Sequence, residues 1–318
     1  CFYQGAGSDD PDAATDSGDT DTDTDTDTDT DTDIDTDTDA DTDSHSGSGA
    51  IANRWAHISA DFSHTCAVKI DNSIECWGNN TEGQCDAPDG LFSQVSAGWH
   101  HSCGLKVDGA IECWGHDCHG QSQAPDGTFT QVAASTAHTC ALADDGTVVC
   151  WGCDSDENDG QCDAPSGTFS QIAVGRFHSC GVRTSGEVAC FGKNDEGQLD
   201  APTGSFSQVS AGEVHTCGLR STGTISCWGC VGSNSGQCTP PDGTFTAISA
   251  GYFHNCAIRT DGTVACWGWG GQKQCEAPPG TFTQVSGGWL QTCGLREGGV
   301  ANCWGCFTTE DQGQCDVP

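Results

Sequence analysis

The 318-residue sequence has few basic residues and no long apolar run. It contains ten Lys and Arg against 46 Asp and Glu, which gives a formal net charge of −36. Nucleic acid and anionic membrane surfaces carry charge of the same sign and would repel such a chain. No apolar stretch approaches the roughly 18 residues that a membrane-spanning helix needs. We therefore expect no nucleic-acid partner and no transmembrane segment.

Methionine is absent, whereas cysteine and glycine are abundant, with 24 Cys and 44 Gly. Since the chain does not begin with Met, we expect a processed mature chain. Disulfide-rich chains are rare in reducing compartments, where thiols are kept reduced. We therefore expect an extracellular protein or one on the outer cell surface.

The charge divides the sequence into two parts near residue 50. Residues 1–50 hold 17 Asp and no Lys or Arg, and they end in the run Ser-His-Ser-Gly-Ser-Gly-Ala. The remaining residues carry most of the Cys and Gly. The sequence therefore predicts an acidic, Asp/Thr-rich extended tail or stalk over 1–50, and a folded domain over 51–318.

The tail alternates Asp with Thr over residues 19–43. A strand would place all the Asp on one face, about 7 Å apart, so repulsion favours an extended, solvated spacer. Two sharper interpretations stay open. Asp-x-Asp-x-Asp begins a calcium loop, but the required Gly and closing Glu are missing, so calcium is the weaker one. The stronger one is O-glycosylation of a stalk, at Thr20, Thr22, Thr24, Thr26, Thr28, Thr30, Thr32, Thr36, Thr38 and Thr42.

The domain over 51–318 consists of seven repeats. Most contain His-Thr/Ser-Cys, a second Cys ten residues after the first, and then Trp-Gly, as in HTCAVKIDNSIECWG from residue 64. Seven units of about 40 residues, each with several short strand patterns, are typical of a propeller with one blade per repeat. We therefore expect an all-β fold, a seven-bladed β-propeller.

The two cysteines of each repeat flank a turn, and together they predict a disulfide across a hairpin. They face each other if the loop has three residues and ends in a left-handed residue, which is Asn72 in the first repeat and a Gly in the others. Opposed residues of an antiparallel pair are close enough for a disulfide. The expected pairs are Cys66–Cys76, Cys103–Cys113, Cys140–Cys150, Cys180–Cys190, Cys217–Cys227, Cys256–Cys266 and Cys293–Cys303.

A second set of cysteines occurs only in the repeats whose loop after Trp/Phe-Gly is longer than in the others. In four repeats five residues separate this Gly from the Gln that recurs later in every repeat, whereas the third, fifth and seventh repeats have eight, seven and eight residues there. Only these three loops have Cys at both ends, as expected if disulfides close insertions. A zinc site at Cys-Trp-Gly-Cys is the disfavoured alternative. The expected pairs are Cys153–Cys162, Cys230–Cys238 and Cys306–Cys315.

Four cysteines remain, and we pair them by position. Cys85 and Cys118 lie in corresponding loops of neighbouring repeats, which predicts a bridge between them. Cys275 is then left with Cys1. A Cys1–Cys275 bond between successive subunits would build a head-to-tail filament, with Phe2 and Tyr3 as an apolar plug. The alternative is that Cys1 carries a lipid, because Cys1 followed by a polar spacer looks like a mature bacterial lipoprotein.

The repeats resemble the regulator of chromosome condensation repeat family. The resemblance rests on a Gly two residues ahead of His-Thr/Ser, on Gly-x-Val/Ile, on Trp-Gly and on the later Gly-Gln, and it covers residues 51–318. It implies a seven-bladed propeller, here of a secreted, disulfide-rich bacterial type. The functions of the family are diverse and include a nuclear nucleotide exchange factor, a plant light receptor and a secreted inhibitor of β-lactamases. The disulfides and the acidic charge argue against the nuclear role.

The two residues before each repeat His differ from repeat to repeat, whereas their flanks recur. They are expected to form turns on one rim of the propeller. Aromatic and Arg side chains often anchor interfaces, so this rim is a candidate binding surface. The alternative is that some of these side chains plug the central channel. The candidate rim residues are Phe62, Trp99, His100, Arg176, Phe177, Tyr252, Phe253 and Trp289.

Candidate catalytic residues should interrupt a repeat, and none does so in a recognisable catalytic arrangement. Six repeats place His before the first Cys, which raises a metal hypothesis. A structural His that bonds to backbone is the favoured interpretation, because it recurs with the repeat. We expect no enzyme, no metal and no cofactor.

Two functions fit these observations. The first is an extracellular structural or interaction protein, a propeller bead on an acidic stalk that joins copies of itself head-to-tail. The second is a surface lipoprotein whose propeller rim binds a protein or a glycan.

Overall fold

The computed structural model describes residues 54–318 except 137, 154–157 and 307–310. The chain divides into two units, Cys1–Ala50 and Ile51–Pro318. The first unit lies outside the described residues, and with it Cys1, Phe2, Tyr3 and the candidate glycosylation sites. Among the residues that the structure does describe, none belongs to a helix that is long and apolar enough to cross a membrane.

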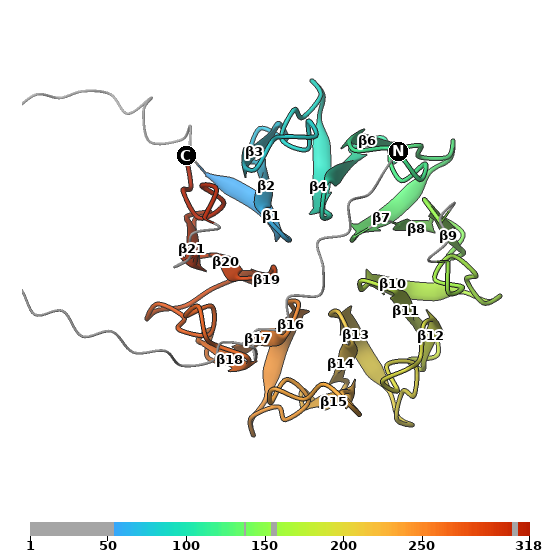
Figure 1. Cartoon of the computed structure of the whole chain (residues 1–318), viewed down its shortest axis with the longest axis vertical. Helices are drawn as coiled ribbons and strands as arrows, with labels where there is room; N and C mark the ends of the chain where they lie inside the picture. The colour runs from blue at the N-terminus through green and yellow to red at the C-terminus, as the bar shows by residue number, and fades with distance from the viewer. Residues whose placement is uncertain (1–53, 137, 154–157, 307–310) are drawn as a thin grey trace, which may run out of the picture. The chain divides into compact units, whose positions relative to one another are not determined.

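The second unit is a seven-bladed β-propeller, as the repeats predicted. Seven three-stranded antiparallel sheets surround a central axis, and each is one blade (Figure 1). The inner strands are β1 (Trp55–Ala60), β4 (Phe92–Ala97), β7 (Phe129–Ala134), β10 (Phe169–Val174), β13 (Phe206–Ala211), β16 (Phe245–Ala250) and β19 (Gln284–Gly287). The middle strands are β2 (His64–Lys69), β5 (His101–Lys106), β8 (Thr139–Ala143), β11 (His178–Arg183), β14 (His215–Arg220), β17 (His254–Arg259) and β20 (Gln291–Leu295). The outer strands are β3 (Ile74–Gly78), β6 (Ile111–Gly115), β9 (Val148–Trp151), β12 (Val188–Gly192), β15 (Ile225–Gly229), β18 (Val264–Gly268) and β21 (Ala301–Gly305).

The inner strands are amphipathic with one irregularity. In β4, Phe92, Val95 and Ala97 are buried while Ser93 is exposed. Phe92 and Val95 are three residues apart, which strict alternation would place on opposite faces. A register shift between Phe92 and Gln94 corrects this, because a bulge adds one residue to the strand and turns Phe92 back into the core. Burial of such a Phe contributes about 2–3 kcal/mol.

Each middle and outer strand pair forms the hairpin that the Cys spacing predicts. Cys66 is opposite Cys76, and the same register recurs in all seven blades. The loop ends in a left-handed residue, with φ of 68° at Asn72 and 90° at Gly109. The seven hairpin disulfides join Cα atoms that are 4.0 to 4.1 Å apart. They are the pairs given by the ten-residue spacing.

The hairpin disulfides belong to the core between blades. Cys103 of blade 2 is fully buried and packs in one cluster with Phe129 and Val132 of blade 3. The same arrangement recurs with Cys217 of blade 5 and Phe245 of blade 6. Each disulfide therefore fixes its own hairpin and also forms part of the surface on which the next blade packs.

Buried histidines join each blade to the next one. His101 Nε2 lies 2.9 Å from Thr139 Oγ1, and His215 Nε2 lies 2.9 Å from Asn255 Oδ1. Asn255 Oδ1 can only accept, so Nε2 carries the proton there. The corresponding contacts join His64 to Ser102, His138 to Ser179, His178 to Thr216 and His254 to Thr292. The histidines are structural, but the expectation that they bond to backbone is wrong, because their partners are side chains of the next blade.

Amides and hydroxyls of the inner strands close the remaining gaps between blades. The Gln94 side chain donates to Val132 O at 3.0 Å and accepts from Val132 N at 3.1 Å, in the manner of a short strand pairing. Gln284 of blade 7 bridges in the same way to Ile58 of blade 1. The ring closes at the last loop as well, where Gln314 O accepts from Trp77 Nε1 at 3.0 Å. The last blade therefore contacts the first through the same kinds of bond that join the other blades.

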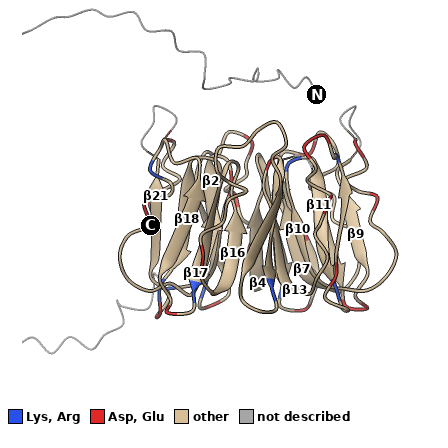
Figure 2. Cartoon of the chain, turned by 90° about the horizontal axis from the view of Figure 1, so that it is seen from below, with Lys and Arg blue, Asp and Glu red and all other residues tan. Residues whose placement is uncertain are grey.

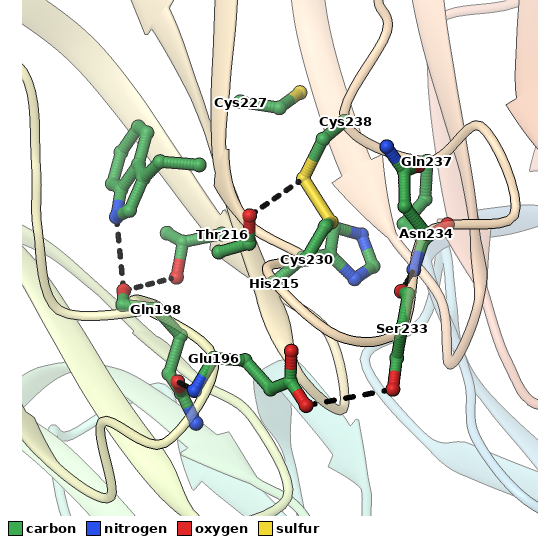
Figure 3. The surroundings of a disulfide bond; sticks show 12 residues. Glu196, Gln198, His215, Thr216, Cys227, Cys230, Ser233, Asn234, Gln237 and Cys238 are labelled. Atoms are coloured by element: carbon green, nitrogen blue, oxygen red, sulfur yellow. Dashed lines mark hydrogen bonds between the residues drawn. A yellow bond between two sulfur atoms is a disulfide. The ribbon is translucent and has the colours of Figure 1, made fainter.

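Disulfides close the three long loops, as the spacing predicts. They are Cys153–Cys162, Cys230–Cys238 and Cys306–Cys315, with Cα atoms 6.3 to 6.4 Å apart. Figure 3 shows the second of them, close to the contact between Glu196 and Ser233 of the neighbouring loops. These loops and their counterparts lie at one end of the propeller, and most charged residues lie at its two ends, away from the strands (Figure 2).

The expected bridge between Cys85 and Cys118 is wrong. Cys85 is a free thiol, whereas Cys118 is disulfide-bonded. Cys85 Sγ lies 3.2 Å from the carbonyl oxygen of Asn79. Asn79 is at the position that the first Cys occupies in the three loops closed by disulfides. The thiol therefore points into its own loop and not toward blade 2. Cys275 is also a free thiol, 3.5 Å from Trp269 O, and its expected partner Cys1 lies outside the described residues.

We expect the thiols of Cys85 and Cys275 to react slowly with iodoacetamide at mildly alkaline pH. Burial raises the pKa of Cys85 to about 12 and that of Cys275 to about 11, so the reactive thiolate is scarce. Alkylation followed by mass spectrometry should be about 100-fold slower than for free cysteine, and slowest at Cys85. Denaturation without reductant should abolish the difference. Rapid labelling of the native protein would contradict the burial of both thiols.

Candidate binding face

The turns between inner and middle strands lie at the same end of the propeller as the long loops. Backbone hydrogen bonds join the two: His116 N donates to His100 O at 2.8 Å, and Trp269 N donates to Phe253 O at 2.9 Å. We call this end, with the inner-to-middle turns and the loops after the outer strands, the turn face. All eight candidate rim residues lie on it.

The first residue of each turn points toward the propeller axis, and several of these residues meet there. Phe62 stacks on Trp289 with ring centroids 4.1 Å apart and planes at 8°. Phe62 also contacts Trp99 at 4.4 Å, and Trp289 contacts Tyr252 at 6.2 Å. We call Phe62, Trp99, Arg176, Tyr252 and Trp289 the axial cluster. These five residues come from blades 1, 2, 4, 6 and 7, so the cluster spans the axis.

Arg176 links the two sides of the axial cluster. Its guanidinium carbon lies 5.4 Å from the Trp99 ring centroid and 5.6 Å from that of Tyr252, within the range of cation–π attraction. Its Nη1 also pairs with Glu213 Oε1 at 2.5 Å and bonds to the Tyr252 hydroxyl. Burial raises the pKa of Glu213, while the bond from Tyr252 and the Arg176 charge act in the opposite direction.

The second turn residues form an outer layer around the axial cluster. His100 stacks on Trp99 at 5.4 Å, Phe177 lies 4.7 Å from the Arg176 guanidinium carbon, and Phe253 meets Tyr252 edge-on at 4.6 Å. The interpretation that some of these side chains plug the channel therefore holds for the axial cluster, whereas the binding interpretation stays a prediction. The axial cluster covers the channel, and Trp99 is only 9% exposed. His100, Phe177 and Phe253 are half-buried and face outward around it.

A further histidine group lies beside His100. His116 is 6.2 Å from His100, and His119 is 6.4 Å from His116, measured between ring centroids. In the part of the chain that the structure describes, no group of three or more His, Cys, Asp or Glu could hold a metal.

The repeat itself matches a known family. Residues 55–84, 92–121, 129–161, 169–198, 206–237 and 245–274 match the regulator of chromosome condensation (RCC1) repeat, and together they make up more than half of the chain. The chain belongs to the RCC1 repeat family. Blade 7 has the same three-stranded sheet and hairpin disulfide as the six matched RCC1 repeats, and a loop disulfide like those of blades 3 and 5. No curated protein matches the whole sequence.

Solved propellers of similar fold include two plant receptor ectodomains. The entire ectodomain of the receptor kinase CR4 from Physcomitrella patens is 25% identical, with a TM-score of 0.66 over 78% of this chain and 72% of that chain. The CRINKLY WD40 ectodomain of the receptor kinase ACR4 from Arabidopsis thaliana is 22% identical, with a TM-score of 0.66 over 80% of this chain and 99% of that chain.

Prp20p from Saccharomyces cerevisiae, whose binding to Gsp1p and histones has been characterised, is more distant. It is 17% identical, with a TM-score of 0.60 over 73% of this chain and 80% of that chain. At this identity the likeness is one of fold.

Two residues near the axis were not among the candidates predicted from the variation of the turns. Glu213 is the first turn residue of blade 5 and the ion-pair partner of Arg176. Asp61 stands where five other blades have Gly, just before the turn. An alignment of the seven repeats against each other shows the departure at Asp61, because five of the other six blades have Gly there, whereas Glu213 occupies a position that varies in every blade.

Proposed function

We propose that the propeller is a non-enzymatic extracellular binding domain that engages a protein partner through the turn face. One observation carries the proposal: the turn residues differ in every blade while the framework around them repeats. Strands, disulfides and inter-blade bonds are nearly identical from blade to blade, so the turns give the face its individual character. Aromatic and Arg side chains at these turns are the residue types that most often anchor protein interfaces.

Disulfides also cross-link the turn face. Loop disulfides close the three longest loops, and hairpin disulfides fix the strands that carry the turns. A rigid surface loses little conformational entropy on binding, which favours affinity. Loops that served only as connections would not need these cross-links.

The charge of the turn face favours a basic partner. The described loop residues after the outer strands include only two cations, Lys193 and Lys273. The described carboxylates of the same loops are Glu82, Asp86, Asp89, Asp117, Asp126, Asp159, Asp163, Asp195, Glu196, Asp200, Asp242, Glu276, Asp311 and Asp316. Complementary charge speeds encounter and excludes acidic competitors. The binding of histones by Prp20p gives a precedent for a basic partner on this fold.

The many disulfides and the similarity to receptor ectodomains support the extracellular location. The glycosylated stalk, the lipid at Cys1 and the Cys1–Cys275 filament stay predictions, since they involve residues outside the described ones. A glycan ligand at the same aromatic surface is the alternative to a protein partner.

Capture of extracellular proteins of the source organism by the immobilised propeller tests the proposal. Phe253→Asp on the turn face should abolish capture of the wild type's partner, and rising salt should weaken it. Val300→Asp is the control, because Val300 is 52% exposed in the hairpin at the opposite end of blade 7. Near-ultraviolet circular dichroism would show that both variants are folded. Equal capture by the two folded variants would contradict the proposal.

A further inference from the structure

The inner strands enclose a chamber of about 240 Å³ on the propeller axis. It extends to the turn face, where Phe62, Trp99 and Tyr252 line it together with Arg176 and Glu213. The chamber is thus bounded by aromatic rings and charged groups at one end. A channel wall built only to hold blades together would not need these residue types.

The wall of the chamber is polar. A serine from each of five blades lines it, and its hydroxyl oxygen accepts a backbone N–H of the next inner strand at 2.8 to 3.0 Å. Ser286 also donates its hydrogen to Ala60 O at 3.5 Å, whereas the other four hydroxyls keep a hydrogen and a second lone pair for another partner. The five are Ser59, Ser96, Ser210, Ser249 and Ser286.

Asp61 lines the same chamber and interrupts the repeat. The equivalent position is Gly in five blades, and a Cβ atom there would lie 2.3 to 2.5 Å from a carbonyl oxygen of the next blade. Those five glycines are Gly98, Gly175, Gly212, Gly251 and Gly288. Blade 1 therefore places a carboxylate at a position where five of the other six blades have no side chain and blade 3 has only Ser135.

The charge of Asp61 is not neutralised by another described residue. Arg176 is already paired with Glu213, and no described Lys, Arg or His forms an ion pair with Asp61. Burial raises the pKa of Asp61 to about 7, and a hydrogen bond from the backbone of Phe62 opposes this only in part. An ionised carboxylate in such a place is costly unless a cation accompanies it.

We propose that the chamber binds a small organic ammonium ion, with Asp61 as its counter-ion. The rings of Phe62, Trp99 and Tyr252 cover the turn-face end of the site, where the Arg176 guanidinium already lies against Trp99 and Tyr252 and is paired with Glu213. An ammonium ion beside the Asp61 carboxylate offsets the cost of its charge. The serine hydroxyls accept hydrogen bonds from, or donate them to, a polar tail. A bare metal ion fits less well, because the described residues offer no group of three or more acidic, His or Cys ligands.

Choline is the probe, and its neutral isostere 3,3-dimethyl-1-butanol is the matched ligand control. Isothermal titration of the full chain should show saturable binding of choline and none of the alcohol. Asp61→Asn should weaken choline binding by at least tenfold. Asp86→Asn, which removes a loop carboxylate outside the chamber, should leave it unchanged. The thermal stability of Asp61→Asn should equal or exceed that of the wild type, because a buried charge is removed.

Measuring the protons released on choline binding distinguishes a role of Asp61 as counter-ion from a role in shaping the chamber alone. At pH 7 about half of Asp61 is protonated, so choline binding should release about half a proton in the wild type and none in Asp61→Asn. Glu213, Arg176 and Tyr252 also face the chamber, but they are already joined to one another. Titration in two buffers of different ionisation enthalpy measures the release. The proposal would be overturned if choline showed no saturable binding, or if Asp61→Asn bound choline as tightly as the wild type.

Discussion

Lowering the pH from 7 to 5 should destabilise the propeller by roughly 10 kcal/mol. The cause is the set of six buried histidines that join neighbouring blades. Burial lowers the pKa of five of them, including His101, to about 3, and that of His215 to about 4. In the unfolded chain they titrate near 6.5 and bind protons that the folded state excludes.

The direction follows from the lowered pKa values. Above pH 6.5 the lowered pKa values do not reduce the free energy of unfolding. As the pH falls from 7 to 5, this free energy decreases by about 2 kcal/mol per histidine. Asp61 acts in the opposite direction, since its pKa is raised to about 7, and it offsets about one histidine. Guanidinium unfolding at both pH values, without reductant, measures the change.

His101→Gln is the matched variant for this prediction. Blade 7 already carries Gln291 at the equivalent position, fully buried, so the fold accepts an amide there. The variant should take up one proton fewer on unfolding and show a correspondingly shallower pH dependence. A stability that does not change between pH 7 and 5 would mean that the histidines are not buried in the neutral form.

Gly212→Ala should destabilise the propeller by more than about 3 kcal/mol. A Cβ at Gly212 would lie 2.4 Å from the His215 ring and 2.5 Å from the carbonyl oxygen of Gly251. Neither neighbour can retreat, because His215 is hydrogen-bonded to blade 6 and Gly251 belongs to its inner turn. The contact would therefore force blades 5 and 6 apart.

Ser135→Ala is the control for this prediction, since blade 3 already carries a side chain at the equivalent position. Its melting temperature should stay within a few degrees of the wild type, whereas that of Gly212→Ala should fall by about 10 °C. Equal melting temperatures for the two variants would contradict the close packing of the glycines around the axis.

Local spacing was sufficient to predict the blades. The separation of ten positions from Cys66 to Cys76, with a left-handed residue at position 72, fixes the hairpin register without any knowledge of the rest of the fold. Loop length likewise identified the three stapled loops. Both arguments depend on residues fewer than a dozen positions apart, where chain geometry leaves few alternatives.

Contacts between blades were harder to predict. His101 bonds to Thr139, 38 residues away, and only the packing of blade 2 on blade 3 brings the two together. The Cys85–Cys118 prediction failed because proximity of two loops does not fix the direction in which a thiol points. The turn residues were grouped correctly on one face, but the sequence did not separate those that cover the axis from those that face outward.

The central claim is that the turn face is the binding surface, and site-specific photo-crosslinking tests it most directly. A crosslinking amino acid at Phe253 or Trp269 would probe the turn face, and one at Val107, which is 56% exposed in a hairpin of blade 2, would probe the opposite end. After illumination with extracellular material of the source organism, we expect a discrete partner adduct from Phe253 and Trp269 and none from Val107. An adduct that forms at Val107 and not at the turn face would contradict the account.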